Sequence, residues 1–307
     1  MYAPFRGTLL GIGITGATVA ALAAGYFRSP RRRRYPLHGW LGMIALAAAE
    51  LLLWRGIEPV PTYFTPIVWS AFILIADGAV LALTHGSRLH NAPLSMARMA
   101  LLSIPLWLIF EAYNLRLQNW IYTGISSNWA AAMFGYAWSF ATITPAIFEG
   151  ADLVQALWPA RPANPWTISG RAENLLAACG AACLIVPLLV PRRMAAYLFG
   201  LVWIGFILLL DPVNHRIGLP SLLGDLAEGF TGRLRGFLLS GWICGWLWEF
   251  WNYWAEAKWH YIFPMFQEAK IFEMPLPGYL GFPPFALECF TMYVTAAGLL
   301  GWLRRVA

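Results

Sequence analysis

Four glutamates give this chain its clearest chemical signal. They lie inside or at the ends of apolar stretches, at Glu111, Glu149, Glu249 and Glu288. A carboxyl group in apolar surroundings is costly unless it has a hydrogen-bond partner or a chemical role. Because burial favours the neutral form of a carboxyl group, such an acid can donate a proton to an alkene or polyene. A structural hydrogen bond between two parts of the chain is the alternative.

Glu288 is the acid that we expect to lie deepest. It stands about nine residues into its predicted helix, which is about 13 Å at a rise of 1.5 Å per residue. Pro284 lies one turn before it, and Pro145 lies one turn before Glu149. A proline inside a helix removes a backbone hydrogen bond, so we expect a kink at both places.

Tryptophans are concentrated around Glu249, at Trp242, Trp246, Trp248, Trp251, Trp254 and Trp259. Aromatic faces stabilise cations, including the carbocation that forms when an alkene is protonated. Trp246 and Trp248 are expected to lie deep enough for this role. An aromatic belt at the membrane interface is the simpler explanation for Trp254 and Trp259.

Two glutamates each have an asparagine three residues later, Glu111 with Asn114 and Glu249 with Asn252. Residues three apart share one face of a helix. Each pair can orient a ligand or remove a proton from it. Alternatively, each pair caps a loop or hydrogen-bonds to its twin.

These residues recur because the chain contains an internal repeat. The strings VWSAFILIAD and VWIGFILLLD end at Asp77 and Asp211, which are expected to cap helices or contact loops. Further matches follow in the same order: Glu111 and Asn114 with Glu249 and Asn252, Trp120 and Tyr122 with Trp259 and Tyr261, and Pro145 and Glu149 with Pro284 and Glu288. Ordered matches at nearly constant spacing predict a duplication.

The composition predicts that membrane helices position these residues. Hydrophobic residues make up 59% of the 307 positions and charged residues 12%, whereas a soluble domain carries about 25% charged residues. Apolar runs of about 20 residues are long enough to span a bilayer. Nine helices are predicted, at residues 8–27, 38–56, 65–84, 93–113, 130–158, 172–190, 194–211, 234–253 and 279–303.

The predicted fold is an all-α, polytopic transmembrane helical bundle. It comprises an N-terminal helix with a basic loop (residues 1–34) and two parallel four-helix repeats (residues 35–160 and 161–307). An even number of helices gives both repeats the same orientation, so their axis should follow the membrane normal. The four arginines at positions 31–34 favour a cytoplasmic loop. We therefore expect a bacterial-type inner (cytoplasmic) membrane, with the N-terminus outside and the C-terminus cytoplasmic.

Several site types find no support in the sequence. The net charge of +6 comes from short loops between apolar runs, so it does not indicate nucleic acid. The four cysteines lie in apolar segments without a histidine, and the five histidines fall at helix ends or in loops. Neither pattern is typical of a zinc or haem site. We expect no metal, haem or nucleotide cofactor.

The repeated pattern resembles the integral-membrane lycopene cyclase domains, a family of duplicated carotenoid cyclases. In that family an acid and an asparagine end one helix, and a W-x-Y loop follows. A proline then stands shortly before acidic residues on the next helix. The matching residues here are Glu249, Asn252, Trp259, Tyr261, Pro284 and Glu288, with Glu111, Asn114, Trp120, Tyr122, Pro145 and Glu149 in the first copy. In the family the acid and asparagine are adjacent, and two consecutive acids follow the proline. The resemblance implies protonation-driven chemistry on a carotenoid or other isoprenoid.

Three functions are therefore considered. The first is an enzyme that protonates an isoprenoid lipid and cyclises, hydrates or isomerises it. The second is a proton- or cation-coupled transporter, and the third is a non-catalytic membrane subunit that binds pigment, quinone or lipid. For the enzyme, the expected catalytic acids are Glu288, Glu249, Glu149 and Glu111. The expected ligand-binding residues are Asn252, Asn114, Trp246, Trp248, Trp259, Tyr261, Trp120 and Tyr122, with the second copy as the more active one.

Overall fold

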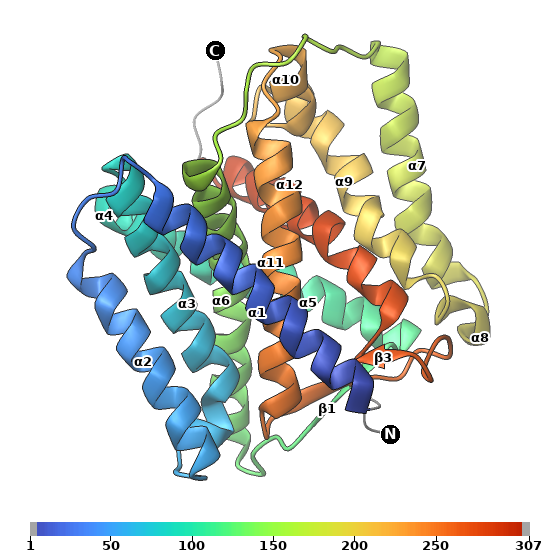
Figure 1. Ribbon diagram of the computed structural model, residues 1–307. Helices are drawn as coiled ribbons and strands as arrows, with labels where there is room; N and C mark the ends of the chain where they lie inside the picture. The colour runs from blue at the N-terminus through green and yellow to red at the C-terminus, as the bar shows by residue number, and fades with distance from the viewer. Residues whose placement is uncertain (1–4, 303–307) are drawn as a thin grey trace.

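Figure 1 shows a computed structural model of the chain, which describes residues 5–302. The described part is all-α, as predicted, apart from short strands in its loops. Its helices are α1 (Phe5–Arg28), α2 (Leu37–Trp54), α3 (Val60–Thr84), α4 (Arg88–Asn91), α5 (Pro93–Leu117), α6 (Trp129–Leu157), α7 (Gly170–Leu189), α8 (Arg192–Ala195), α9 (Phe199–Arg216), α10 (Leu222–Ala227), α11 (Gly232–Trp254) and α12 (Phe282–Leu299). The strands are β1 (Trp120–Thr123), β2 (Lys258–Tyr261), β3 (Lys270–Ile271) and β4 (Met274–Pro275), and η1 (Leu276–Gly281) is a 3₁₀ helix.

Six of the described helices are long and apolar enough to cross a bilayer, namely α1, α2, α3, α5, α6 and α7. This is compatible with a multi-pass membrane protein. Helices α9, α11 and α12 have 18, 23 and 18 residues but fall outside this group. Polar residues at the end of α9 and the many tryptophans and glycines of α11 lower their hydropathy. The short helices α4, α8 and α10 lie in loops and were not predicted.

The two halves of the described chain, residues 35–160 and 161–302, pack their helices in matching pairs. Helix α2 lies against α3 and α7 lies against α9, while α3 contacts α6 and α9 contacts α12. A glycine permits the close approach in both outer pairs. A Cβ atom at Gly42 would stand 2.8 Å from the Ala71 carbonyl oxygen, and one at Gly180 would collide with the Leu209 nitrogen. Small residues commonly allow such contacts between membrane helices.

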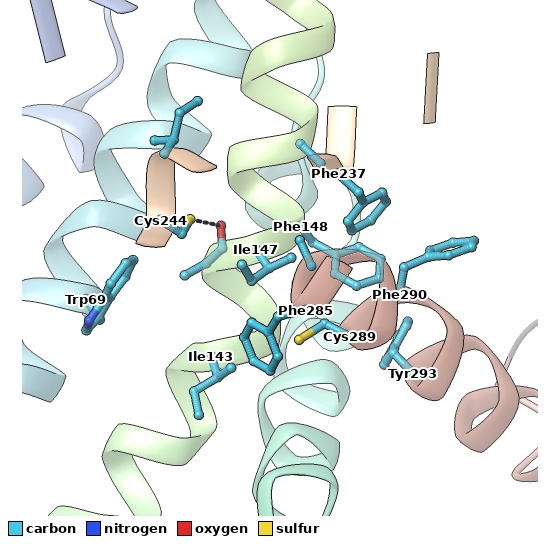
Figure 2. Packing of buried hydrophobic residues seen from close by; sticks show 14 of the residues in the cluster. Trp69, Ile143, Ile147, Phe148, Phe237, Cys244, Phe285, Cys289, Phe290 and Tyr293 are labelled. Atoms are coloured by element: carbon cyan, nitrogen blue, oxygen red, sulfur yellow. Dashed lines mark hydrogen bonds between the residues drawn. The ribbon is translucent and has the colours of Figure 1, made fainter. Parts of the chain in front are cut away.

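The core lies where α6 of the first half meets α11 and α12 of the second. Phe148 packs against Phe237 and Tyr293 with ring centroids 4.9 and 5.1 Å apart, and Phe237 packs against Phe290 at 5.0 Å (Figure 2). Aromatic pairs at these separations stabilise packing beyond the area that they bury. The halves therefore share one hydrophobic core.

The halves differ most just before their last helices. Helix α6 begins at Trp129, twenty residues before Glu149, whereas α12 begins at Phe282, only six residues before Glu288. In the second half the missing turns are replaced by β3, β4 and η1. Helix α1 crosses α11 and reaches this segment (Figure 1), where a Cβ at Gly11 would lie 2.5 Å from the Phe272 ring. The segment that contains β3, β4 and η1, together with helix α1, therefore packs against the second half.

Candidate functional site

A two-stranded antiparallel ribbon joins the two halves of the chain. Strand β1 carries Trp120 and Tyr122, and strand β2 carries Trp259 and Tyr261. In the ribbon Trp120 pairs with Tyr261, and Tyr122 pairs with Trp259. Each tryptophan therefore stands opposite the tyrosine of the other half. The two W-x-Y strings, 139 residues apart, form one structure.

The two asparagines hold this ribbon to the preceding helices. The Asn114 Nδ2 group donates to the Trp120 carbonyl oxygen at 2.9 Å, and its Oδ1 accepts from the Trp120 nitrogen at 3.2 Å. Asn252 makes the same two contacts with Trp259, both at 3.0 Å. Both amides are thus committed to backbone groups, which supports the alternative in which the asparagines fix a loop.

The Glu111 carboxylate receives three hydrogen bonds on one oxygen. Its Oε1 accepts from the Tyr122 hydroxyl at 2.5 Å, from Trp107 Nε1 at 2.8 Å and from Trp120 Nε1 at 3.3 Å. All three partners are donors. The surroundings therefore favour Glu111 as a hydrogen-bond acceptor. Two of the three bonds connect this acid, near the end of α5, to strand β1.

Glu249 repeats the scheme in the second half with one change. Its Oε1 accepts from the Tyr261 hydroxyl at 2.8 Å, and that hydroxyl accepts from Trp259 Nε1 at 2.9 Å. Its Oε2 has no hydrogen-bond partner among residues 5–302. The indole thus reaches the acid through the tyrosine rather than directly. Glu249 is fully buried. Among residues 5–302 the hydrogen bond from Tyr261 is therefore the single one that compensates its carboxyl group for the loss of water.

The two ribbon tyrosines remain protonated donors. Burial raises the pKa of Tyr122 well above its ordinary value of 10.0, and the neighbouring Glu111 carboxylate adds to the effect. Burial and Glu249 do the same to the pKa of Tyr261. A phenol with a raised pKa keeps its O–H at neutral pH. In each Tyr–Glu pair the proton therefore stays on the tyrosine oxygen and is donated to the glutamate in a hydrogen bond.

Both tyrosines line a cavity of about 130 Å³ between the two halves. Aromatic rings from both halves make up much of its wall, among them Trp69, Trp107, Trp120, Tyr122, Trp203, Trp248, Trp259 and Tyr261. Five of these were predicted as ligand-binding residues: Trp120, Tyr122, Trp248, Trp259 and Tyr261. Trp246 lies elsewhere, stacked on Tyr279 with ring centroids 4.0 Å apart.

Three cavity tryptophans were missed as site residues. Trp69 and Trp203 are matched positions of the internal repeat, and their recurrence was the signal that could have singled them out. Trp107 stands one turn before Glu111, which places its indole within reach of the acid. The internal repeat therefore marks part of the cavity wall.

Glu149 and Glu288 are fully buried but do not line the cavity. None of their carboxyl oxygens has a hydrogen-bond partner in the described part of the chain. Each follows a cavity residue by three positions, Glu149 after Ala146 and Glu288 after Phe285. Both acids therefore stand about one helical turn beyond the cavity.

The predicted kink at Pro284 is wrong. Pro284 is the third residue of α12, where a helix needs no N–H donor. Pro145, in contrast, lies inside α6. Because α12 begins at Phe282, Glu288 stands about 9 Å along its helix rather than about 13 Å.

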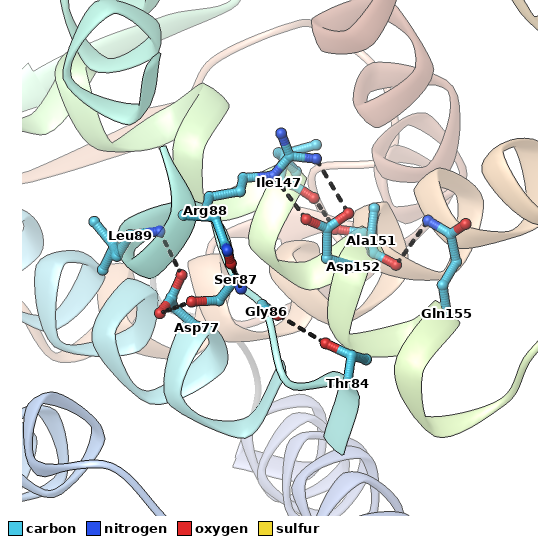
Figure 3. Close-up of polar contacts among 12 residues, drawn as sticks. Asp77, Thr84, Gly86, Ser87, Arg88, Leu89, Ile147, Ala151, Asp152 and Gln155 are labelled. Atoms are coloured by element: carbon cyan, nitrogen blue, oxygen red, sulfur yellow. Dashed lines mark hydrogen bonds and ion pairs between the residues drawn. The ribbon is translucent and has the colours of Figure 1, made fainter. Parts of the chain in front are cut away.

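Asp77 and Asp211 cap short helices in the loops, as predicted. Asp77 accepts from Ser87 Oγ at 2.7 Å and from the Leu89 nitrogen at 2.9 Å (Figure 3), next to the Arg88–Asp152 ion pair at 2.7 Å. The Asp211 carboxylate accepts from the nitrogens of Leu222 and Leu223 at 2.7 and 2.9 Å. These contacts again match between the halves, and they are structural.

The cavity and its two Tyr–Glu pairs thus form the candidate site. Among residues 5–302 no three His, Cys, Asp or Glu side chains come together in a metal-binding group. Comparison with family models, curated proteins and solved structures finds no match to this chain.

Proposed function

We propose that this chain is an integral membrane enzyme that performs proton-initiated chemistry on an isoprenoid lipid. The observation that carries the proposal is an aromatic cavity lined by a tyrosine from each half, each hydrogen-bonded to a glutamate, half-buried Glu111 and fully buried Glu249. Tyrosine and glutamate can hand on a proton, and aromatic faces favour a developing cation. One N-terminal helix and two parallel four-helix repeats would surround the cavity, with the ribbon on the outer side of the membrane.

In this proposal the two Tyr–Glu pairs take opposite roles. For this step the Tyr261–Glu249 hydrogen bond reverses: a protonated Glu249 donates to the tyrosine oxygen while the Tyr261 hydroxyl proton passes to a double bond of the ligand. The carbocation is stabilised by the indole rings of Trp248 and Trp69. Glu111 accepts the proton that leaves the rearranged ligand, through Tyr122, and exchange with water then reprotonates Glu249 and deprotonates Glu111. The ligand is isomerised or cyclised with no net change in its atoms.

Deuterium incorporation tests this proposal. Purified protein in lipid nanodiscs is incubated in D₂O with linear isoprenoid polyenes. The products are separated by chromatography, and their masses are measured by mass spectrometry. A rearranged product that carries deuterium is expected. Glu249→Gln and Tyr261→Phe should each lower its rate by about a hundredfold or more, the usual range for a general acid. Absence of any labelled product across the polyenes would contradict the proposal.

Glu273→Gln provides the matched control. Glu273 is also buried and lies in the loop between α11 and α12, but it is hydrogen-bonded to His260 at 2.9 Å and does not line the cavity. Its removal should leave the rate of conversion within a few-fold of the original. A loss as large as that of Glu249→Gln would point to general disruption of the outer loops.

Proton-coupled transport is the second candidate, supported by Glu149 and Glu288. Both are buried acids without a hydrogen-bond partner in the described residues, and intramembrane acids of this kind commonly carry protons. Proton uptake into liposomes that requires Glu288 would favour transport. A ligand that is recovered from the cavity unchanged, without proton flux, would favour the non-catalytic pigment-, quinone- or lipid-binding subunit.

A further inference from the structure

A basic pocket lies at the C-terminal end of helix α1. It has a volume of about 590 Å³, and its wall includes Arg31, Arg32, Arg33, Thr84 and His85. The arginines belong to the loop between α1 and α2, whereas Thr84 and His85 end helix α3. The backbone nitrogen of Arg33 donates to the Ala82 carbonyl oxygen at 2.9 Å, which ties the loop to α3. We call this feature the arginine pocket.

The arginine pocket lies where two candidate membrane spans end. Helix α1 ends at Arg28 and helix α3 at Thr84, and both are long and apolar enough to cross a bilayer. The two ends lie on the same side of the molecule (Figure 1). Beside the loop, Tyr35 packs edge to face against Tyr26 and Trp40, with ring centroids 5.9 and 5.6 Å apart. Tyrosine and tryptophan gather at the head-group level of a bilayer, so these rings place the pocket at that level.

The three arginines of the pocket have no anionic partner among residues 5–302. Other arginines of the chain are paired with carboxylates: Arg88 with Asp152, Arg216 with Glu173 and Arg233 with Asp225. The guanidinium groups of the pocket form no such ion pair in the described part of the chain, and no acidic residue lines the pocket. Like charges that share one wall repel one another. The pocket therefore favours an anion.

The position of Arg32 suits a phosphate group in particular. Its Cζ atom lies 5.6 Å from the centroid of the Tyr26 ring and 5.2 Å from that of the Phe27 ring. Contact with aromatic faces stabilises the guanidinium group and leaves the N–H donors at its edge for other acceptors. The planar fork of these donors matches two oxygens of a phosphate.

Apolar side chains beside the pocket distinguish a lipid from a soluble phosphate compound. Phe27 and Leu37 flank the arginine loop and are 67% and 74% exposed. Trp40, Leu41 and Ile44 continue this exposed surface along α2. A phospholipid whose phosphate reaches the arginines would cover these side chains with its acyl chains. A soluble phosphate compound would leave them uncovered.

We propose that the arginine pocket binds the phosphate group of an anionic phospholipid, with the acyl chains against α1 and α2. The sequence predicts a cytoplasmic position for this loop, and the cytoplasmic leaflet is the one that carries a negative surface charge. The proposal goes beyond the isoprenoid chemistry and does not depend on it. The pocket lies at the opposite end of α1 from the contact with β3, and it shares no lining residue with the aromatic cavity.

Lipid binding to the purified protein tests the proposal. Protein in a neutral detergent at physiological ionic strength is titrated with phosphatidylglycerol or phosphatidylcholine of the same acyl chains, and native mass spectrometry reports the bound lipid. Phosphatidylglycerol should bind about tenfold or more tightly. The double variant Arg32→Gln with Arg33→Gln should lower its affinity by about tenfold or more, because each arginine near an anionic lipid contributes about fivefold.

The same loop offers a matched control. Arg28 and Arg34 are exposed and flank the pocket arginines but do not line the pocket. Arg28→Gln with Arg34→Gln removes the same charge, and the affinity for phosphatidylglycerol should stay within about threefold of the original. Equal losses in the two double variants would overturn the proposal, because the charge of the whole loop would then attract the lipid.

Two measurements on the original protein need no variant. Equal affinity for phosphatidylglycerol and phosphatidylcholine would overturn the anionic site. Glycerol 1-phosphate should not displace phosphatidylglycerol at comparable concentration, and displacement would replace the lipid with a soluble phosphate compound. These outcomes leave the proposed enzymatic function standing, just as failure of the deuterium experiment would leave the lipid site standing.

Discussion

Trp120 stands directly opposite Tyr261 in the ribbon, although the two residues come from opposite halves of the chain. The reciprocal pair, Tyr122 with Trp259, completes a pattern that is unchanged when the halves are exchanged. A two-fold arrangement of this kind requires both W-x-Y strings at the same depth and in the same register. It brings Glu111 and Glu249 to equivalent positions, each behind a tyrosine that lines one cavity.

The asparagines that hold the ribbon should contribute measurably to stability. Asn114 makes three hydrogen bonds, to both backbone groups of Trp120 and to the Asn119 nitrogen at 2.8 Å. Asn114→Ala leaves buried backbone groups unpaired, so we expect a loss of about 2–4 kcal/mol in unfolding free energy. Asn128→Ala removes only one bond, at the exposed start of α6, and should cost about 1 kcal/mol. Denaturant unfolding measures both, and equal losses would contradict this role.

The Tyr261–Glu249 pair should show energetic coupling. In a double-mutant cycle with Tyr261→Phe and Glu249→Leu, we expect a coupling energy of about 1–3 kcal/mol, because the 2.8 Å hydrogen bond ends on a fully buried carboxyl group. Tyr113→Phe is the control, since that hydroxyl donates to the Leu184 carbonyl oxygen instead. Combined with Glu249→Leu, it should be additive to within about 0.5 kcal/mol. Additivity of both pairs would show that the tyrosine does not support the acid.

Filling the inner end of the cavity should prevent ligand binding. Ala146 lines that end, and the matching position of the second half is already occupied by Phe285. Ala146→Phe should lower the affinity for a long-chain ligand by about tenfold or more, because overpacking costs about 1–3 kcal/mol. Ala146→Gly, which keeps the space open, should retain binding. Ligand titration together with thermal unfolding separates a blocked cavity from a misfolded protein.

Asp225 should make stability depend on pH. It lies in the short helix α10, and burial raises its pKa from 3.8 to about 6, although Arg233 at 3.0 Å opposes the shift. Because its pKa is higher in the folded state than in the unfolded state, the folded protein binds the extra proton between these values. The contribution of Asp225 to the free energy of unfolding is therefore highest below about pH 4 and falls as the pH rises to about 6.

Asp225→Asn should remove that dependence. Unfolding midpoints measured from about pH 4 to pH 7 should fall less steeply in the variant than in the original protein. Glu268→Gln, at an exposed position in another loop, serves as the control and should leave the slope nearly unchanged. A slope that Asp225→Asn does not alter would assign the dependence to another group.

Much of the architecture followed from the sequence alone. Apolar runs of bilayer length predicted an all-α chain, because a backbone surrounded by lipid must satisfy its hydrogen bonds within helices. The internal matches singled out Trp120, Tyr122, Trp259 and Tyr261, all of which reach one cavity. Asp77 and Asp211 were expected to cap loops, and they do.

Only the tertiary structure decided which recurring residues face the cavity. Sequence spacing gives the face of a helix but not the neighbour against which that face packs, so Glu149 and Glu288 were expected at the site and lie about one turn beyond it. The asparagines bind backbone because the ribbon passes within reach of them, which depends on strand pairing between residues 139 positions apart. The sequence by itself determined which residues recur in the two halves. Packing between the halves determined that the Tyr–Glu pairs, rather than the deeper acids, border the cavity.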